Sequence, residues 1–325
     1  LPGVFPMANF PKRVRLCECF CRDGLQNRSE QISTGQKVRM VDFCTEAGFD
    51  LIEVTSFAHP KYLPQFFDSA EVLAKIKRKK GVQYIALVPN EKGMDRCLEL
   101  LSKGAGPTAV TVILAASEAY SKKNVKMTVS EAVEGIKKIV PRARQAGLYV
   151  IGSISNSFGC HIEGDIPFER VARLAKEFAG LGADEIQFGD TTGQANPVQA
   201  EEFFTNMKRE VPGAKLIAHF HDSRGVAIAN SIAALRAGVE RFDGSFGGIG
   251  GRPRGIVEGA DMRYTGNLTT EDWVCLLHEL GVECGVSKEK AIEGGKLAEE
   301  ILGEKLFGHV TEAGPAVHEA RPGEA

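Results

Sequence analysis

Short apolar segments alternate with longer segments of helical periodicity along most of this chain. The short segments have the length of β-strands, and turn-forming residues separate them from the helical patterns. We therefore predict eight strands, at residues 14–21, 51–56, 84–89, 109–115, 149–155, 185–189, 216–221 and 241–246.

The longer segments between these strands carry signals for the start and end of helices. Thr128 and Glu131 fit a capping box, and Pro197 follows Asn196 at a first helical position. Glycine closes many of the segments, as expected at a helix C-terminus. We predict helices at residues 34–47, 66–79, 92–103, 129–146, 167–181, 197–211, 226–237 and 270–280, with a ninth at 288–302.

Eight strand–helix units of this regularity predict a (β/α)8 TIM barrel with an extra C-terminal helix. The alternative is a doubly wound open sheet, but the turn after the first strand lacks the glycine-rich composition of a phosphate loop. We expect one catalytic barrel domain with its helical extension over residues 12–306, followed by a loose tail over 307–325. The ninth helix favours a homodimer or a higher homo-oligomer.

Composition excludes several classes of function. The formal net charge of −2 provides no broad basic field for nucleic acid, and no apolar run is long enough for a membrane span. Eight cysteines in a chain of 325 residues fit a reducing compartment, so we expect a cytoplasmic protein. Cys17, Cys19 and Cys21 share one face of the first predicted strand, and we expect them to pack against the outer helices.

The sequence His219-Phe220-His221 ends the seventh predicted strand. Side chains alternate between the two faces of a strand, so both imidazole rings point the same way. Two histidines at this spacing at a strand end favour a pair of metal ligands over satisfied core residues. A second signal is Arg22-Asp23, which follows the first apolar run.

Other polar residues also follow the predicted strands, and in a barrel these ends form one rim, where the active site lies. Two nitrogens from His219 and His221, with oxygens from Asp23 and Asn267, suit a six-coordinate ion such as Mg²⁺ or Mn²⁺. Zn²⁺ prefers fewer ligands and thiolates. The further polar residues on this rim are Arg22, Glu53, Ser56 and Asp190.

Arg22 keeps its charge at all relevant pH values and could stabilise an enolate oxygen as it forms. The structural alternative is a salt bridge with Glu53 or Asp190 across the barrel mouth, and the two interpretations are compatible.

These residues together resemble the 3-hydroxy-3-methylglutaryl-CoA lyase family, a group of metal-dependent barrel enzymes (DRE-TIM metallolyases) that also includes isopropylmalate synthase. The resemblance extends from about residue 12 to residue 306. The matching stretches are 22–27 (Arg-Asp-Gly-Leu-Gln-Asn), 52–57 (Ile-Glu-Val-Thr-Ser-Phe), 89–90, 122–124, 189–191, 219–222 (His-Phe-His-Asp), 248–251 and 266–272.

The resemblance implies a retro-Claisen cleavage of an acyl-CoA to acetyl-CoA and a keto acid. It implies that Arg22 stabilises the enolate and that Glu53 and Asp190 position the substrate or carry a proton. Gln26 and Ser56 would line the same pocket. The implied metal ligands are Asp23, His219, His221 and Asn267.

One departure from the family lies in the glycine-rich loop, where Arg252 replaces a cysteine that is tied to proton transfer. Arginine cannot act as a general base near neutral pH. Arg252 and Arg254 could instead bind a substrate carboxylate, as in citramalyl-CoA, or simply anchor the loop. Candidates for the missing proton-transfer group are Glu258, Asp261, Tyr264, His161 and a metal-bound hydroxide. Another departure is Ser153, which stands where the family has a tyrosine.

Two other functions remain open at this point. One is a condensing acyltransferase of the isopropylmalate synthase type, although the chain has no room for a regulatory domain after the barrel. The other is a metal-binding barrel without activity. Lys122, Lys123 and Asn124 follow the fourth predicted strand, where they could meet the phosphates of coenzyme A or form an ordinary solvated turn.

Overall fold

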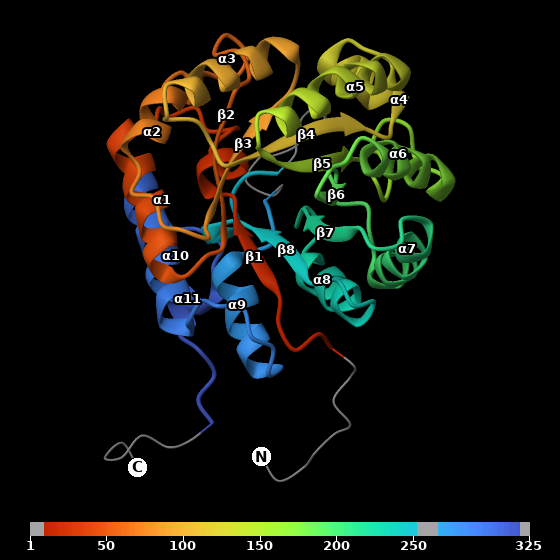
Figure 1. Cartoon of the computed structure of the whole chain (residues 1–325). Helices are drawn as coiled ribbons and strands as arrows, with labels where there is room; N and C mark the ends of the chain where they lie inside the picture. The colour runs from red at the N-terminus through yellow and green to blue at the C-terminus, as the bar shows by residue number, and fades with distance from the viewer. Residues whose placement is uncertain (1–9, 252–265, 319–325) are drawn as a thin grey trace, which may run out of the picture.

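The structure, a computed structural model, describes residues 10–251 and 266–318. Eight parallel strands form a closed barrel in sequence order, with helices around the outside (Figure 1). The predicted fold class is therefore confirmed. The strands are β1 (Arg15–Glu18), β2 (Leu51–Ser56), β3 (Gln83–Val88), β4 (Ala109–Ala115), β5 (Tyr149–Ser155), β6 (Glu185–Asp190), β7 (Lys215–Phe220) and β8 (Arg241–Gly244).

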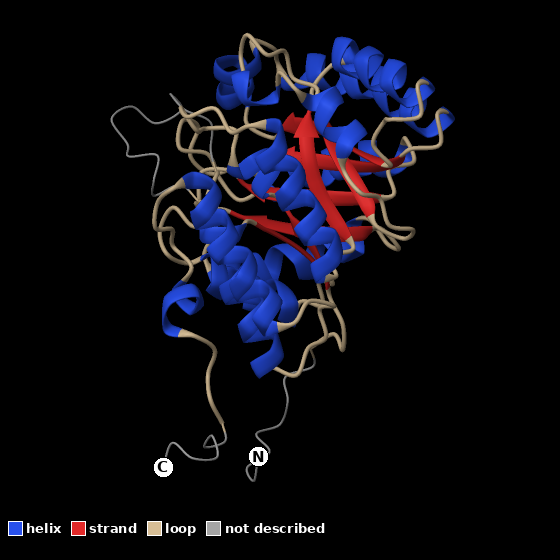
Figure 2. Cartoon of the chain, turned by 90° about the vertical axis from the view of Figure 1, so that its left-hand side faces the viewer, coloured by secondary structure: helices blue, strands red, loops and turns tan. Residues whose placement is uncertain are grey.

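Most helices match the predicted ranges to within a few residues, and Figure 2 shows the strands enclosed between them. Helix α4 and the short helix α11 were not predicted, and α2 is shorter than the predicted helix at 66–79. The helices are α1 (Thr34–Ala47), α2 (Ser69–Lys75), α3 (Glu91–Ser102), α4 (Glu118–Val125), α5 (Val129–Gln145), α6 (Phe168–Gly180), α7 (Pro197–Glu210), α8 (Ala227–Arg236), α9 (Thr270–Glu279), α10 (Lys288–Leu302) and α11 (His309–Ala313).

The ends of several helices have identifiable causes in the sequence. The predicted capping box at Thr128 and Glu131 begins α5, and an equivalent pair begins α1. Gly48 ends α1 with a φ of 103°, a left-handed conformation that glycine adopts without steric cost. Within the described residues, no helix is both long and apolar enough to cross a membrane.

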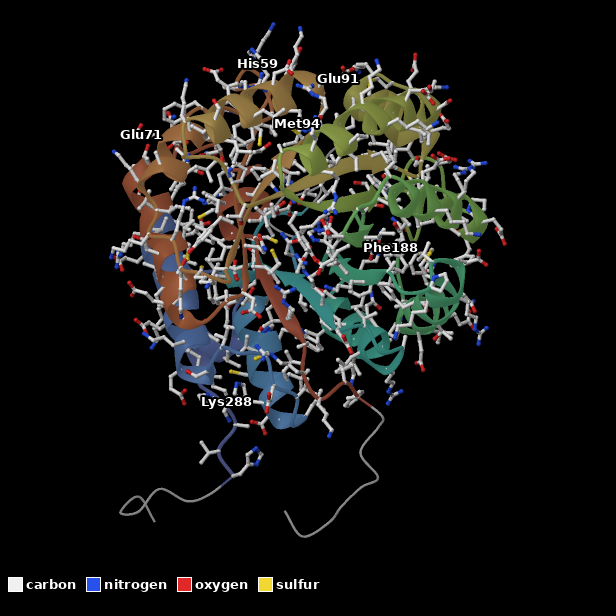
Figure 3. All side chains as sticks on the ribbon, in the orientation of Figure 1. His59, Glu71, Glu91, Met94, Phe188 and Lys288 are labelled. Carbon is white, nitrogen blue, oxygen red and sulfur yellow. The ribbon has the colours of Figure 1, made fainter. Side chains whose placement is uncertain are left out.

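The core has two layers. One fills the barrel itself, and the larger one lies between the strands and the helices. Phe188 belongs to the larger layer, whereas Glu71, Glu91 and Lys288 lie at the periphery (Figure 3). The residues that fill the barrel interior are Cys17, Cys19, Leu51, Ile85, Ala109, Ile151 and Ile217.

The first strand is shorter than predicted. It ends at Glu18 and is followed by a π-helix at Phe20–Gly24. The expectation that three cysteines face the outer helices is wrong for two of them, because β1 turns this face toward the interior and the π-helix then redirects only Cys21. Cys17 and Cys19 lie inside the barrel, whereas Cys21 packs in the outer layer, with its Sγ 3.6 Å from the carbonyl oxygen of Lys37.

The C-terminal helices pack against the start and end of the barrel. Helix α10 lies against α1 and α9, and it also contacts the 3-10 turn Phe246–Gly248 that follows β8. The segment expected to be a loose tail begins with α11, whose first residues donate backbone hydrogen bonds to the carboxylate of Asp272. This part of the segment is therefore held against α9.

Candidate metal centre and active site

The last part of β7 and the segment at residues 266–269 bring the predicted metal ligands together. His219 lies in β7, and His221 follows its end. His221 pairs with Asn267 in an isolated antiparallel bridge, and the amide of Leu268 donates to the carbonyl of Phe220 at 3.1 Å. Asn267 is therefore placed beside the histidines by backbone pairing, although it lies 46 positions after His221 in the sequence.

Asp23 joins this cluster from the π-helix after β1. The Nε2 atoms of His219 and His221 are 3.0 Å apart, and Asp23 Oδ2 lies 3.7 Å from His221 Nε2. Asn267 Nδ2 donates to the same carboxylate oxygen at 2.6 Å. All four side chains are buried.

Hydrogen bonds behind the two rings fix which ring nitrogen faces the cluster. His221 Nδ1 lies 2.8 Å from the carbonyl oxygen of Thr191, and His219 Nδ1 lies 3.1 Å from Asp243 Oδ2. A carbonyl or carboxylate oxygen only accepts hydrogen bonds, so both Nδ1 atoms carry the hydrogen. The two Nε2 atoms face each other, and in a metal-bound state both would present lone pairs to the ion.

The donor atoms of the cluster fit a divalent ion. Within the described part of the chain, Asn267 Oδ1 is buried and has no hydrogen-bond partner, which leaves a free oxygen donor. Suitable ligand atoms of Asp23, His219 and His221 lie within 4.8 Å of one another. Two imidazole nitrogens with carboxylate and amide oxygens suit Mg²⁺ or Mn²⁺ and leave positions open for a substrate.

The charges around the cluster act differently on its members: burial lowers the pKa of His219, but the hydrogen bond to Asp243 and the attraction of Asp243 and Asp23 together outweigh burial and raise that pKa. Burial alone would raise the pKa of Asp23, but attraction by Arg22, His221 and His219 outweighs it and lowers the pKa to about 2. Burial and repulsion by His219 lower the pKa of His221 to about 4. At neutral pH the carboxylate is therefore ionised and His221 is neutral.

Arg22 links this cluster to Glu53 on β2. Its Nε donates to Glu53 Oε2 at 2.6 Å, and its Nη1 donates to Asp23 Oδ1 at 2.7 Å. Burial raises the pKa of Glu53, against the attraction of Arg22. Glu53 Oε1 is buried without a partner among the described residues. The salt bridge between Arg22 and Glu53 that the sequence allowed is present, and it holds the guanidinium beside the predicted metal ligands.

Gln26 and Ser56 lie at the same end of the barrel but differ in what they contact. Gln26 Nε2 donates to Asp23 Oδ1 and to the carbonyl of Gly251, both at 2.8 Å, so it supports a predicted ligand. Ser56 pairs in register with Leu87, two residues beyond the interior residue Ile85, and therefore faces the barrel interior. Its hydroxyl accepts the amide of Ala58 at 3.0 Å.

Asp190 is placed differently from the other predicted site residues. It pairs in register with Phe220, which belongs to the outer layer, so it faces away from the interior. Its two carboxylate oxygens accept the amides of Gln194 and Ala195, at 2.7 and 3.1 Å. Burial raises the pKa of Asp190 to about 6. The sequence prediction overlooked that the loop after β6 would turn back onto this side chain.

The beginning of the glycine-rich loop rests on the ligand cluster. The amide of Gly251 donates to Asp23 Oδ2 at 2.9 Å. Gly250 has a φ of 102°, and a Cβ atom there would lie 2.6 Å from Asn267 Nδ2, so only glycine fits. The predicted substrate-binding residues Arg252 and Arg254 lie outside the described residues, as do Glu258, Asp261 and Tyr264.

Sequence reasoning missed Asp243, which holds His219 from β8. Gln187 Nε2 also donates to Asp243 Oδ2, and Gln187 Oε1 in turn accepts a hydrogen bond from the hydroxyl of Ser153. This chain of polar side chains crosses the barrel from β5 to β8. An acidic residue inside the strand predicted at 241–246 was the available signal.

Comparison with known proteins identifies relatives over nearly the whole chain. The HMGL-like family model matches residues 13–297. Hydroxymethylglutaryl-CoA lyase YngG from Bacillus subtilis is 38% identical over 297 residues, which cover 91% of this chain and 96% of that protein. The 3-hydroxy-3-isohexenylglutaryl-CoA/hydroxy-methylglutaryl-CoA lyase of Pseudomonas aeruginosa is 39% identical over 295 residues, which cover 91% of this chain and 95% of that protein.

A solved structure agrees with these sequence relatives. An HMG-CoA lyase from Acenitobacter baumannii, in complex with coenzyme A and 3-methylmalate, superposes with a TM-score of 0.87. It is 31% identical, and the match covers 95% of this chain and 98% of that one. The prediction of a hydroxymethylglutaryl-CoA lyase-like carbon–carbon lyase is confirmed, and the chain belongs to the HMGL-like family.

Proposed function

We propose that this protein is a divalent-metal-dependent carbon–carbon lyase that uses Mg²⁺ or Mn²⁺. It cleaves 3-hydroxy-3-methylglutaryl-CoA, or a closely related branched 3-hydroxyacyl-CoA, to acetyl-CoA and a keto acid. The observation that carries this proposal is the contact of Arg22 with both Asp23 and Glu53, directly beside the paired imidazoles. A fixed positive charge, an ionised ligand set and a carboxylate of raised pKa are the groups that a retro-Claisen cleavage uses.

Asp23, His219, His221 and Asn267 would hold the ion, which would polarise the substrate oxygens. Glu53 accepts the proton of the substrate hydroxyl, because its raised pKa and its unpartnered oxygen suit a general base. The electron pair of the broken O–H bond forms the new carbonyl as the carbon–carbon bond breaks. The pair from that bond becomes the enolate of acetyl-CoA, whose oxygen Arg22 stabilises, and the proton that Glu53 took up returns to the enolate carbon to give acetyl-CoA.

Asp190 acts in this proposal as a positioning residue. Its carboxylate gathers the amides of Gln194 and Ala195, and so shapes the turn that begins at Thr191. The carbonyl of Thr191 holds the Nδ1 hydrogen of His221. Asp190 therefore supports the orientation of a metal ligand through the loop rather than through direct contact.

The substrate side group is the finer part of the proposal. Arg252 and Arg254 add two positive charges to the loop that carries a cysteine in the family, and arginine binds carboxylates well. Citramalyl-CoA carries its carboxylate directly on the carbinol carbon, and we propose that these charges bind a carboxylate in that position. The relative that holds 3-methylmalate, a dicarboxylic acid, supports this idea.

A panel of 3-hydroxyacyl-CoA esters, followed by mass detection with and without chelator, tests the function. We expect acetyl-CoA to appear only with metal, and citramalyl-CoA to be cleaved faster than 3-hydroxy-3-methylglutaryl-CoA. Arg252→Ala should reverse that preference. If acetyl-CoA and a 2-oxo acid instead condense with release of free thiol, the condensing acyltransferase is the correct function. Absence of turnover in either direction would contradict both the lyase and the acyltransferase functions.

We extend the proposal to the protein's setting. All eight cysteines are free and buried, which supports a reducing compartment such as the cytoplasm. Helix α10 packs on α1 and α9 at the outside of the barrel. We propose that it takes part in a homodimer or a higher homo-oligomer. Size measurement in solution tests the assembly.

A further inference from the structure

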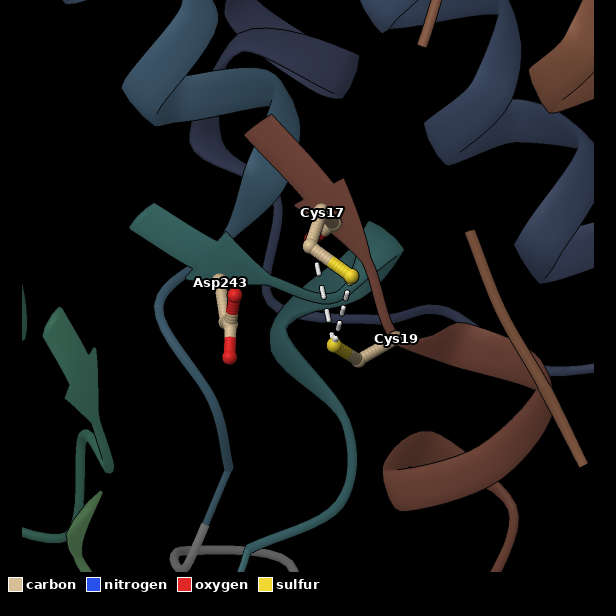
Figure 4. A group of neighbouring side chains, drawn as sticks. All are labelled: Cys17, Cys19 and Asp243. Carbon is tan, nitrogen blue, oxygen red and sulfur yellow. Dashed lines mark hydrogen bonds between the residues drawn. The ribbon is translucent and has the colours of Figure 1, made fainter. Parts of the chain in front are cut away.

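A second group of side chains with metal-binding chemistry lies one layer deeper in the barrel than the proposed active site. Cys17 on β1 and Asp243 on β8 are register partners, so their side chains lie side by side on the inner face of the barrel. Cys19 follows the end of β1 and points to the same place (Figure 4). The two Sγ atoms and a carboxylate oxygen of Asp243 lie within 4.8 Å of one another, and all three residues are buried.

The separation of the two sulfur atoms matches a tetrahedral thiolate site. Cys17 Sγ and Cys19 Sγ are 3.8 Å apart. With a Zn–S distance of about 2.3 Å and tetrahedral angles, two thiolates on one zinc ion are about 3.8 Å apart. A disulfide would need the same atoms at about 2.05 Å. The pair is therefore spaced for a shared ion.

Asp243 can serve this group without leaving His219. Its Oδ2 receives the hydrogen bonds of His219 Nδ1 and Gln187 Nε2. Its Oδ1 is buried and has no hydrogen-bond partner among the described residues. An unpartnered carboxylate oxygen in the barrel interior carries a large desolvation cost, and a cation at the neighbouring thiols would remove that cost.

We propose that Cys17, Cys19 and Asp243 form a second metal site, selective for a thiophilic divalent cation such as Zn²⁺ or Cd²⁺. Binding replaces the two thiol protons, which leave to solvent, by two sulfur–metal bonds, and Asp243 supplies the third ligand. The two sites differ in the softness of their ligands: the proposed active site has nitrogen and oxygen donors, and the deeper site has two sulfur donors. This inference does not depend on which acyl-CoA the enzyme cleaves.

Titration of the reduced full-length protein with Cd²⁺, in the presence of excess Mg²⁺, tests the second site. We expect an ultraviolet thiolate-to-cadmium charge-transfer band that saturates at one equivalent. Cys19→Ser should abolish the band, and the double variant Cys17→Val/Cys19→Val should bind one equivalent of Cd²⁺ less than the wild type. Circular dichroism and the thermal midpoint report whether each variant is folded.

Cys21→Ser is the matched control, because Cys21 is also buried and lies two residues from Cys19, but on the outer face. It should keep the full band. The proposal is overturned if the wild type gives no band, which would leave a hydrogen-bonded thiol pair only. It is also overturned if the band persists in a folded Cys19→Ser variant, since other thiols would then be responsible.

Discussion

Two buried carboxylates at the same end of the molecule differ sharply in their charge. Asp23 and Glu271 are both almost fully buried, at 3% and 0% exposure. The pKa of Asp23 is lowered to about 2, whereas burial raises the pKa of Glu271 to about 8. Asp23 has a guanidinium and two imidazoles as neighbours, whereas the main influences on Glu271 besides burial are backbone amides and the acids Asp272 and Glu18. Burial by itself therefore does not mark a reactive carboxylate; its partners do.

Glu271 and its neighbour Glu18 have a structural task. Glu18 Oε1 accepts the amides of Phe20 and Phe246, at 2.9 and 3.0 Å, and both oxygens of Glu271 receive the amide of Gly247 at 3.1 Å. These bonds hold the turn from which the glycine-rich loop begins. Burial raises the pKa of Glu18 to about 7, so neither residue needs to be ionised to perform this task.

Removal of a metal ligand should have the largest effect on the ionised cluster. We expect His221→Ala to lose the ion and to lower kcat/KM by more than about 100-fold. Loss of a residue that only supports a metal ligand costs up to about 100-fold, and loss of the ligand itself should cost more. Calorimetric Mn²⁺ titration and steady-state assays measure the two effects. His278→Ala, on α9, is the control and should match the wild type. Normal Mn²⁺ affinity in a folded His221→Ala protein would exclude this residue as a ligand.

Loss of the positive charge should affect the reaction step more than substrate binding. We expect Arg22→Met to lower kcat by about 10²–10³-fold with little change in KM, because the guanidinium acts on charge that forms only during cleavage. The variant also leaves Glu53 without its partner. Arg22→Met/Glu53→Gln should therefore fold more stably than the single variant yet stay inactive. Recovery of activity in this double variant would contradict the role of Arg22.

Substitution of Asp243 should lower the affinity for the metal ion rather than slow the reaction step. Asp243→Asn weakens the acceptor for the Nδ1 hydrogen of His219, so we expect Mn²⁺ affinity to fall by about 10–100-fold. At saturating Mn²⁺, kcat should largely recover. Assays over a range of metal concentrations separate the two quantities. A loss of kcat that excess metal does not restore would show that Asp243 acts in some other way.

The smallest expected effect is the change in the free energy of unfolding with pH that results from the buried carboxyl groups of raised pKa, such as Glu271. A raised pKa means that the folded state binds the proton more tightly, so the contribution of Glu271 is complete below about pH 4.5 and is lost as the pH rises through about 8. The slope is at most about 1.4 kcal/mol per pH unit for one group. Asp23 acts in the opposite sense, because its contribution is present above pH 3.8 and is lost as the pH falls through about 2.

Urea unfolding of wild type and Glu271→Gln between pH 4.5 and 8 measures this slope. We expect the free energy of unfolding of the wild type to fall more steeply with pH than that of the variant. Glu289→Gln, an exposed residue in the first turn of α10, is the control and should keep the wild-type slope. Equal slopes for wild type and Glu271→Gln would mean that Glu271 is ionised in the folded protein.

The sequence was sufficient to predict the barrel and the meeting of Asp23, His219 and His221 at one rim, because both follow from the regular strand–helix pattern. Alternating side chains placed His219 and His221 on one face, and the closure of a parallel barrel brought Asp23 to the same rim. The ranges of α1 and α10 follow from capping residues and glycine ends.

The features that the sequence did not reveal depend on contacts between distant segments. No simple pattern predicts the π-helix after β1, which separates Cys21 from Cys17 and Cys19. Asp190 lies on the outer side because the loop after β6 supplies amides to it. The link from Asp243 to His219 joins two strands, and it becomes visible only when their register is known.

The most direct test of the central claim is a crystal structure of the protein grown with Mn²⁺ and analysed by anomalous scattering. We predict one strong anomalous peak within coordination distance of Nε2 of both His219 and His221, with Asp23 and Asn267 Oδ1 as the oxygen ligands. If the peak lies elsewhere, or if the two imidazoles share a proton and no Mn²⁺ binds there, the proposed metal-dependent cleavage is wrong.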